Sequence, residues 1–290
     1  MSRAPFFLSI VIPVRNERQQ IGLLVRRLRE TAGSSAEIIV VDDGSTDRSG
    51  EEAAQAGTRV LRHPYPIGNG AAIKRGIRAA RGERILFLDG DGQHDPADIP
   101  KFLALADRYD LVVGSRRFRD QAGLPRALAN WVYNRLASYV TEQRVEDLTS
   151  GFRLLRREDV LPFLSILPNR FSTPTTLTMA YLRSGRSIGY VPVRAGKRSG
   201  KSKLVLWEDG IRFLLIILKI ATLYAPLRIF LPVSLGFLGL GFGYYAYTFI
   251  AFHRFTNMGV LLMTTGILVF LLGLIAEAVA ELRFQQCDER

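Results

Sequence analysis

The sequence predicts an α/β fold in which a mostly parallel, Rossmann-like sheet is followed by interfacial helices and two transmembrane helices. Short runs of aliphatic and β-branched residues alternate with amphipathic segments over residues 8–114, at the spacing typical of βαβ units. Further on, residues 229–252 carry no charge, and after His253 and Arg254 the next charged residue is Glu277. Each of these apolar runs exceeds the roughly 20 residues that a helix needs to cross a bilayer.

The expected elements follow in order along the chain. The strand over residues 8–14 is apolar at nearly every position, as in a strand buried on both faces of a sheet. Further strands are expected at 37–41, 58–61, 84–89, 111–114 and 188–193, with one more after the turn at 146–153. Apolar residues at helical spacing predict helices that end near Glu30 and Gly57, and helices over 71–80, 95–106, 125–140 and 157–184.

These patterns divide the chain into four parts. We expect a folded domain over 1–204, juxtamembrane amphipathic helices over 205–228, two spans over 229–280 and a tail over 281–290. Arg212 and Lys219 favour an interfacial position for the juxtamembrane part over a third span.

Positive charge is concentrated before the spans. Residues 205–290 hold six basic and six acidic residues, so the net charge of +12, from 39 basic and 27 acidic residues, belongs to residues 1–204. Because basic residues collect on the cytoplasmic side of membrane proteins, the domain and both termini are expected in the cytoplasm, at the inner membrane. A tethered basic domain favours anionic headgroups and phosphorylated substrates as partners over nucleic acid. The single cysteine, Cys287, excludes an internal disulfide and fits a reducing compartment.

Several common site types find no support in the sequence. Gly68, Asn69 and Gly70 lack the third glycine of a dinucleotide fingerprint and follow the third expected strand, so we interpret them as the start of a helix. The sequence contains no GxxxxGK[ST] loop for nucleotide phosphates and no histidine or cysteine spacing for zinc. It also lacks the nucleophile elbow that Ser-His-Asp hydrolysis uses.

A cluster of oxygen ligands follows the strand at 84–89. Asp89 and Asp91 are one residue apart, so in an extended chain their carboxylates lie on the same side and repel each other. A hard divalent cation, Mg²⁺ or Mn²⁺, would relieve this repulsion, and Gln93 offers another oxygen. The alternative is a solvated Asp-Gly turn. Acidic residues at the ends of two other strands favour the cation, because ligands of doubly wound sheets lie beyond the carboxyl ends of the strands.

A longer set of ordered motifs resembles a known family. The motifs are IVIPVRNE at 10–17, VDDGSTD at 41–47, FLDGDGQHDP at 87–96, GSR at 114–116, DLTSGFR at 147–153 and RSGKSK at 198–203. They are similar to those of family-2 glycosyltransferases of the GT-A fold, in the branch of dolichyl-phosphate mannose synthase and bacterial polyprenyl-phosphate glycosyltransferases. The resemblance covers about residues 7–204, and the two trailing spans suit bacterial members. Gly90 departs from the alanine that relatives often have, and the Q-x-x-R-W signature of processive synthases does not occur.

The resemblance implies a role for each matched residue. A nucleoside-diphosphate sugar would contact Pro13, Asn16, Glu17, Asp42, Asp43, Lys74 and Asp89. A metal ion, Mg²⁺ or Mn²⁺, would be held by Asp89, Asp91 and Gln93. The phosphate of a polyprenyl lipid would contact Arg116, Ser150, Arg153, Arg198, Lys201 and Ser202. The catalytic residues would be Asp89, Asp91, Arg116 and Asp147.

The implied reaction is inverting transfer of a sugar, with mannose or glucose favoured, from a nucleoside diphosphate to a dolichyl or undecaprenyl phosphate. A lipid monophosphate is mostly ionised at pH 7, so a strong base is unnecessary. Asp147 is therefore expected to orient an arginine or the sugar, with a role as the base as the alternative. The motifs leave the sugar and nucleotide open. Two rival readings are a membrane-anchored transferase with a non-lipid glycan acceptor and a nucleotide-sugar-binding scaffold without turnover.

Two further stretches predict interactions. Residues 194–203 contain five cations, which fits a lid over bound donor, an anchor on lipid headgroups, or both. The first span contains four closely spaced glycines that could pack against other copies and form a homo-oligomer: Gly236, Gly239, Gly241 and Gly243.

Overall fold

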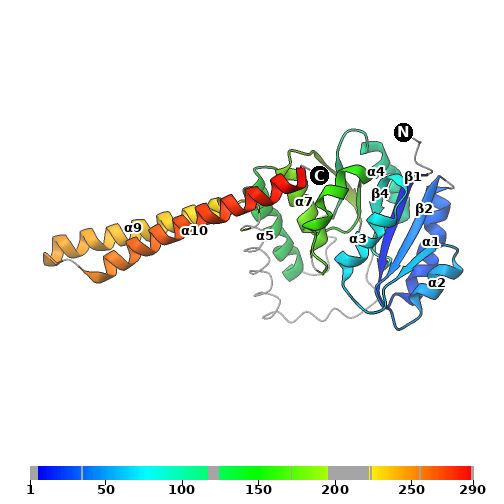
Figure 1. Cartoon of the computed structure of the whole chain (residues 1–290), viewed down its shortest axis with the longest axis horizontal. Helices are drawn as coiled ribbons and strands as arrows, with labels where there is room; N and C mark the ends of the chain where they lie inside the picture. The colour runs from blue at the N-terminus through cyan, green and yellow to red at the C-terminus, as the bar shows by residue number, and fades with distance from the viewer. Residues whose placement is uncertain are drawn as a thin grey trace. The chain divides into compact units, whose positions relative to one another are not determined.

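The chain forms two compact units in the computed structural model, which describes residues 6–33, 35–116, 124–170, 172–194, 222, 224–254 and 256–288 (Figure 1). The first unit comprises residues 1–139 and 143–203, and the second comprises 140–142 and 204–290. All but the first residue of the predicted basic loop at 194–203, and most of the juxtamembrane segment at 205–228, lie outside the described residues.

The first unit is built on a seven-stranded sheet of order β3-β2-β1-β4-β6-β5-β7, which confirms the predicted α/β fold. Its pairs are parallel except for those of β6, which runs antiparallel between β4 and β5. The strands are β1 (Phe6–Val14), β2 (Ala36–Asp42), β3 (Arg59–Arg62), β4 (Gly82–Phe87), β5 (Leu111–Arg116), β6 (Arg153–Arg156) and β7 (Ile188–Val193).

Helices connect these strands at the predicted places, with one exception. They are α1 (Arg18–Ala32), α2 (Ser49–Gln55), α3 (Asn69–Ala79), η1 (Pro96–Asp98), α4 (Ile99–Leu105), α5 (Leu124–Thr141), α6 (Arg157–Val160), η3 (Leu161–Ser165) and α7 (Thr173–Arg183). The single helix predicted over 157–184 is wrong, because this stretch forms α6, the 3-10 turn η3, a loop and α7. Pro168 lies in that loop, and the Ser172 hydroxyl starts α7 by accepting a hydrogen bond from the Thr175 amide at 3.3 Å.

The uniform apolarity of β1 follows from burial on both faces. Ile10 and Ile12 pack in a core cluster with α1 and α4, represented by Leu28 and Phe102. The alternate residue, Val11, faces α3, where a Cβ at Gly76 would clash with the Val11 side chain. Helices therefore cover both faces of the central sheet, and their connections bring the carboxyl ends of β1, β2, β4 and β5 to one edge.

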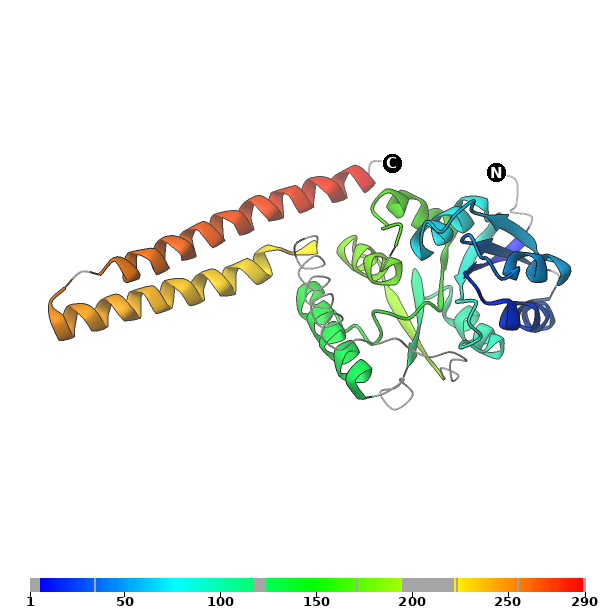
Figure 2. The same ribbon diagram turned by 90° about the horizontal axis from the view of Figure 1, so that it is seen from below.

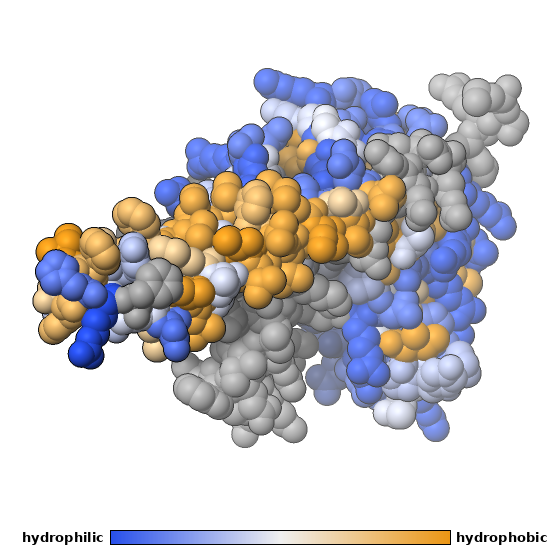
Figure 3. All heavy atoms as spheres, turned by 60° about the vertical axis from the view of Figure 1, so that its left-hand side comes forward, coloured by the Kyte–Doolittle hydropathy of each residue, from blue (hydrophilic) through white to orange (hydrophobic). Residues whose placement is uncertain are grey.

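The second unit contains a hairpin of α9 (Leu227–Phe252) and α10 (Asn257–Asp288), shown in Figure 2. Both helices are long and apolar enough to cross a membrane, as predicted, and apolar side chains cover them in Figure 3. Helix α10 extends to Asp288, so the predicted tail at 281–290 begins as a continuation of this helix. The Ser234 hydroxyl donates to the Gly266 carbonyl at 2.8 Å and joins the two helices.

The glycines of α9 do not all serve one surface. A Cβ at Gly241 would clash with Met263 of α10, so this glycine allows close packing inside the hairpin. In the described part of the chain, no atom lies within 4 Å of a Cβ built at Gly236, Gly239 or Gly243. Packing of these three against other copies stays a prediction.

Candidate functional site

The antiparallel strand β6 gathers residues that are far apart in the sequence. Arg153, its first residue, pairs with Phe87 at the end of β4 and with Val113 of β5. The turn that precedes β6 therefore lies beyond the carboxyl ends of both strands. This places Asp147 beside Arg116 and Gly151 against Asp89.

Asp147 and Arg116 form a two-pronged ion pair. The Arg116 guanidinium donates from Nε to Asp147 Oδ2 at 2.8 Å and from Nη2 to Oδ1 at 2.9 Å. The Asp147 carboxylate is only 2% exposed, and it also accepts from the amides of Thr149 and Ser150 at 3.1 and 3.0 Å. Burial alone would raise the pKa of Asp147, but the bonds and charge of Arg116 lower it below the ordinary value. A carboxylate occupied in this way orients Arg116 and is a poor proton acceptor.

Asp89 lies at the centre of the cluster. Its Oδ2 atom is 3.6 Å from Nε2 of the buried His94, and a Cβ at Gly151 would clash with the same carboxylate. Burial by itself would raise the pKa of Asp89, but His94 and the positive charges of Arg116 and Arg153 lower it. Asp89 is therefore ionised at neutral pH, while its side chain remains 40% exposed.

Asp91 and Gln93 form a tight turn next to Asp89. The Gln93 amide donates to Asp91 Oδ1 at 3.1 Å, and the charges of Asp89 and Asp91 both raise the pKa of Arg116 against the effect of its burial. No group of three histidine, cysteine or acidic residues arranged for a metal occurs among the described residues. Two carboxylates and one amide oxygen nevertheless fit Mg²⁺ or Mn²⁺, since such ions take several ligands from water and substrate phosphates.

Arg153 and Ser150 were predicted at the acceptor phosphate, and both are buried. The Arg153 guanidinium donates to the carbonyls of Ser150 and Leu148 at 2.6 and 3.0 Å and to the Thr178 hydroxyl at 2.6 Å. Burial lowers the pKa of Arg153 to about 10, so its guanidinium stays charged at neutral pH. Its hydrogen bonds to the carbonyls hold the turn that precedes β6 in place. The Ser150 hydroxyl is also buried, and it has no hydrogen-bond partner in the described structure. Of these two residues, Ser150 has a polar atom left for a ligand.

The loops after β1 and β2 are joined to each other. Asn16 adopts a left-handed conformation with φ of 58°, its amide donates to the Ser45 hydroxyl at 3.0 Å, and its side-chain oxygen accepts from the Thr46 amide at 2.9 Å. The Glu17 amide donates to the Ser49 hydroxyl at 2.8 Å. Pro13 precedes this pair of loops inside β1 and is buried. These contacts fix the positions of the loops in which several of the predicted nucleotide-sugar residues lie.

The two adjacent carboxylates at the end of β2, Asp42 in the strand and Asp43 just after it, have different surroundings. Asp43 accepts from the His63 ring at 2.8 Å and from the amides of Ile67 and Gly68 at 2.9 Å each, so it holds the loop after β3. Asp42 accepts from the Ser45 amide through Oδ1, while its buried Oδ2 makes no hydrogen bond in the described part of the chain, with Arg62 Nε at 3.5 Å. Asp42 can accept from a ligand, whereas Asp43 is committed to the fold.

Lys74, predicted at the donor, is also bound within the protein. Its ammonium donates to the Leu167 carbonyl at 3.1 Å and to the Asn169 side chain at 2.5 Å, which ties α3 to the loop before α7. Arg198, Lys201 and Ser202, predicted at the acceptor phosphate, lie outside the described residues.

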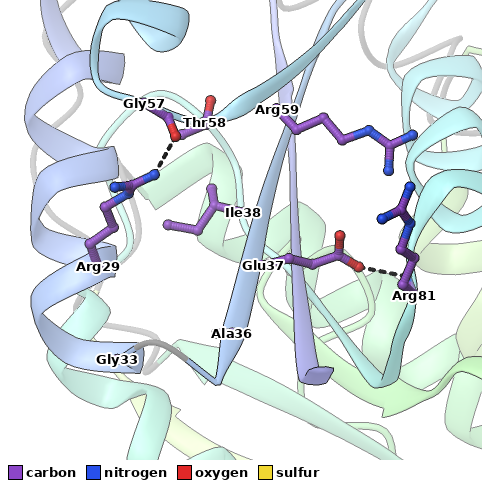
Figure 4. A pocket seen from close by; sticks show the side chains of 9 residues that line it. All are labelled: Arg29, Gly33, Ala36, Glu37, Ile38, Gly57, Thr58, Arg59 and Arg81. Carbon is purple, nitrogen blue, oxygen red and sulfur yellow. Dashed lines mark hydrogen bonds between the residues drawn. The ribbon is translucent and has the colours of Figure 1, made fainter. Parts of the chain in front are cut away.

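Of two cavities, one adjoins the cluster around Asp89 and Arg116, and the other contains none of its residues. One, of about 640 Å³, opens beside Arg116 and is lined by arginines and polar residues of α5 and the following loop, among them Arg135 and Arg144. Another, of about 590 Å³, includes Arg29, Arg59 and Arg81 and lies at the amino-terminal ends of β2 and β3 (Figure 4). None of the predicted site residues lines this second cavity, so the candidate site is at the opposite edge of the sheet.

Sequence reasoning missed three contributors to the site. His94, Gly151 and His63 contact Asp89 or Asp43 directly. The first two are part of the quoted motifs, but their roles depend on contacts across strands. His63 belongs to no motif, and only the loop geometry shows its place.

Comparison with known proteins identifies a family for most of the chain. Residues 9–161 match the family model described as glycosyl transferase family 2, and residues 225–282 match the GtrB C-terminal hairpin. A dodecaprenyl-phosphate galacturonate synthase of Rhizobium johnstonii is 34% identical over 160 residues, covering 51% of this chain and 47% of that protein. A dolichyl-phosphate hexose transferase of Haloferax volcanii is 32% identical over 206 residues, covering 70% of this chain and 89% of that protein. The matched region thus spans about half of the first relative and most of the second.

A solved structure shares the fold of the first unit. Glucosyl-3-phosphoglycerate synthase from Mycobacterium tuberculosis, in complex with Mn²⁺, UDP-glucose and phosphoglyceric acid, aligns with a TM-score of 0.60 at 24% identity. The alignment covers 74% of this chain and 78% of that chain. The resemblance to family-2 glycosyltransferases of the GT-A fold, expected from the motifs, is confirmed by these matches.

Proposed function

This chain belongs to glycosyl transferase family 2, and from that membership we propose that it transfers a sugar from a nucleoside diphosphate to a polyprenyl phosphate at the cytoplasmic face of a membrane. The observation that carries the proposal is the Arg116–Asp147 pair beside Asp89 and Asp91. It sets a fixed cation next to a carboxylate pair that can hold a metal. Such a site can bring two phosphate-bearing substrates together.

The acceptor end is supported by the geometry of Arg116. Asp147 holds its guanidinium through Nε and Nη2, which orients the planar fork without removing its charge. Nη2 also donates to the Thr149 hydroxyl at 2.7 Å, so among the described contacts the Nη1 amino group, with two N–H donors, is left to bind phosphate oxygens. The unpartnered Ser150 hydroxyl offers a further donor in the same turn.

At the donor end, Asp89, Asp91 and Gln93 would hold Mg²⁺ or Mn²⁺. The ion, when bound, neutralises charge that develops on the leaving diphosphate. Asp42 would accept a hydrogen bond from the nucleoside through its buried Oδ2 atom. The mycobacterial synthase, which has the same fold, was solved with Mn²⁺ and UDP-glucose, and this agrees with a divalent cation and a nucleotide sugar as ligands here.

The reaction needs no protein base. An ionised phosphate oxygen of the lipid forms the bond to the anomeric carbon as the bond from that carbon to the diphosphate oxygen breaks, so the configuration inverts. The second pKa of a phosphate monoester is about 6, so the nucleophile is already an anion at neutral pH. The lowered pKa of Asp147 agrees with an orienting role.

The domain assignment is part of the same proposal. Residues 1–204 would carry catalysis, 205–228 would lie at the membrane surface, and 229–280 would anchor the protein. The names of the two relatives favour a polyprenyl phosphate acceptor over a glycan, and the intact carboxylate pair favours turnover over a scaffold.

Transfer of label into lipid tests the proposal. Membranes containing the full chain and polyprenyl phosphate are incubated with a panel of radiolabelled nucleotide sugars, and label is counted in the organic phase. We expect one sugar to be transferred and Asp91→Ala to reduce transfer at least 100-fold. Asp95→Asn is the matched control, because Asp95 lies in the same loop but pairs with the exposed Arg27. Label that stays in the aqueous phase with every sugar contradicts a lipid acceptor, and full activity of Asp91→Ala contradicts the metal assignment.

A further inference from the structure

The cavity of about 590 Å³ lies at the amino-terminal edge of the sheet, opposite the candidate site (Figure 4). Strand β3 pairs with β2 only from Ile39 onward, opposite Arg59, so residues 36–38 of β2 have no described strand on that side. The short β3 therefore leaves a notch beside the start of β2, and this notch forms the cavity. Its volume falls within the range of about 300–1,000 Å³ that is typical of small-molecule sites.

Three arginines line the cavity, and none of them forms an ion pair with a described residue: Arg29, Arg59 and Arg81. Figure 4 shows the guanidinium groups of Arg59 and Arg81 pointing toward each other. Two like charges in this arrangement repel each other, and an anion between them would relieve the repulsion. Glu37 is the one acidic residue among the described residues of the lining, so three positive charges less one negative charge leave a formal charge of +2.

Backbone carbonyls hold two of these guanidinium groups at the cavity. Arg29 donates from Nη2 to the Gly57 carbonyl, and a Cβ at Gly57 would lie only 3.1 Å from the same nitrogen. Arg59 donates from Nη1 to the Ala79 carbonyl at 3.1 Å. Each guanidinium keeps further N–H groups, because it has five donors. Neutral groups thus position these two cations and leave their charges without a counter-ion.

Glu37 holds the backbone of the third arginine. Its Oε1 atom accepts from the hydroxyl of the buried Ser9 and from the backbone amide of Arg81, both at 2.5 Å. These bonds fix the position from which the Arg81 side chain extends, while that side chain makes no hydrogen bond or ion pair within the described part of the chain. All five N–H donors of the Arg81 guanidinium are therefore available to a ligand.

We propose that this cavity binds a phosphate group, carried either by a soluble phosphomonoester or by a lipid headgroup. A phosphomonoester has a charge of about −1.5 to −2 at neutral pH, which matches the +2 of the lining. Arginine is suited to this group, because its planar fork donates to two phosphate oxygens at once. Ala36 and Ile38 supply an apolar part of the lining for the organic portion of such a ligand.

Size favours a small ligand over an added peptide strand. The stretch of β2 without a described partner on this side has three residues, whereas strands of globular proteins usually have about five or six. The cavity is also separate from the donor site, since none of its lining residues belongs to the motifs that contain Asp42, Asp89 and Arg116. A ligand in this cavity and a donor in the candidate site can therefore be bound at the same time.

Chemical modification of arginine in the full chain tests the site. Phenylglyoxal is applied to the protein in phosphatidylcholine nanodiscs, with phenyl phosphate as the soluble phosphomonoester and phenol as the control without a phosphate. A chelator prevents divalent cations from drawing phosphate to the candidate metal site. Peptide mass spectrometry measures modification at each arginine. We expect phenyl phosphate, but not phenol, to slow modification of Arg59 and Arg81, whereas the exposed Arg26 and Arg78 react at an unchanged rate.

A second arm identifies the source of the phosphate. Nanodiscs that contain phosphatidic acid present a lipid phosphomonoester without any soluble one. Protection of Arg59 and Arg81 in these discs supports a lipid source, and protection by phenyl phosphate alone supports a soluble source. If neither condition protects these two arginines, or if Arg26 and Arg78 are protected equally, the proposal is overturned. Protection confined to Arg116 also overturns it, because the phosphate then binds only at the candidate site.

A substitution with a matched control measures the contribution of one arginine. Arg81→Gln removes a cation whose side chain has no contact with a described residue, so the fold should be unaffected. We expect the phenyl phosphate concentration that halves modification of Arg59 to rise about tenfold in this variant. Arg26→Gln removes the same charge from an exposed position of α1 and should leave that concentration unchanged.

Equal half-protection concentrations for Arg81→Gln and the wild type would contradict the site. Neither measurement needs turnover, so the outcome is independent of whether the transferase activity is found.

Discussion

At the residue scale, the Arg116–Asp147 pair shows how hydrogen bonds stabilise a buried carboxylate and hold an arginine in position for a ligand. Asp147 accepts six hydrogen bonds from described residues: three from the backbone and side chain of Arg116, two from the amide and hydroxyl of Thr149, and one from the amide of Ser150. These bonds offset the cost of burying its charge. The result is an arginine whose orientation is set before substrate arrives.

Arg116→Lys tests whether the orientation of the fork matters. Lysine keeps the positive charge but cannot make the paired contact to Asp147, so we expect kcat to fall about 10- to 100-fold with a smaller rise in KM for the lipid phosphate. Initial rates with saturating donor give both constants. Arg78→Lys, on the exposed side of α3, is the matched control. Equal rates for Arg116→Lys and the wild type would show that charge alone suffices.

The stability of the same pair should depend on pH. The folded pKa of Asp147 is lowered below the ordinary value of about 3.9, so its contribution is present above that pH and is lost as the pH falls through the folded pKa. Asp147→Asn is expected to cost about 3 kcal/mol near pH 7. Denaturant unfolding in detergent from pH 7 to pH 3 should show this difference shrinking at the acid end. A difference that grows on acidification would contradict the lowered pKa.

At the scale of elements, the candidate site lies at the ends of strands and in the loops that follow or precede them. Hydrogen bonds join the β1 and β2 loops through Asn16 and Ser45, and Asp43 holds the loop after β3 through His63 and two amides. The adjacent carboxylates at the end of β2 therefore have separate tasks. Asp43 supports the loops, and Asp42 has an oxygen available for a ligand.

A paired substitution separates these two tasks. Asp43→Asn replaces an acceptor of three hydrogen bonds, and we expect a loss of about 2 kcal/mol in the free energy of unfolding. Asp42→Asn keeps an oxygen for the Ser45 amide, so stability should change little while nucleotide affinity falls about tenfold. Denaturant unfolding and calorimetric titration with nucleoside diphosphates measure the two effects. The reverse pattern would show that Asp43 contacts the ligand.

At the scale of the whole molecule, the two candidate spans and the basic domain define a topology that can be tested with one reagent. If the domain is cytoplasmic, Cys287 should react with a membrane-impermeant maleimide only in inside-out vesicles, because two spans return the carboxyl end to the side of the domain. A Cys287→Ser, Arg254→Cys variant should show the opposite labelling. Labelling of both positions from the same side would contradict a two-span topology.

The amino-acid sequence by itself determined the alternation of strands and helices, the two spans and the positions of the motifs. These features depend on hydrophobic period and length, which are local properties of the chain. It also pointed to Asp89, Asp91 and Gln93, since repulsion between neighbouring carboxylates can be read from their spacing. The helix predicted over 157–184 failed because Pro168 and the Ser172 cap divide an otherwise helical pattern.

Only the tertiary structure decided which of the predicted residues have atoms left for a ligand. Arg153, Asp43 and Lys74 make their hydrogen bonds inside the protein, whereas Asp42 and Ser150 keep a buried oxygen without one. These differences follow from β6 pairing with β4 across 66 to 72 positions of sequence, from Phe87↔Arg153 to Arg84↔Arg156, and from loops that meet at one edge of the sheet. Hydrogen bonding is a property of neighbours in space, and no local pattern in the chain specifies them.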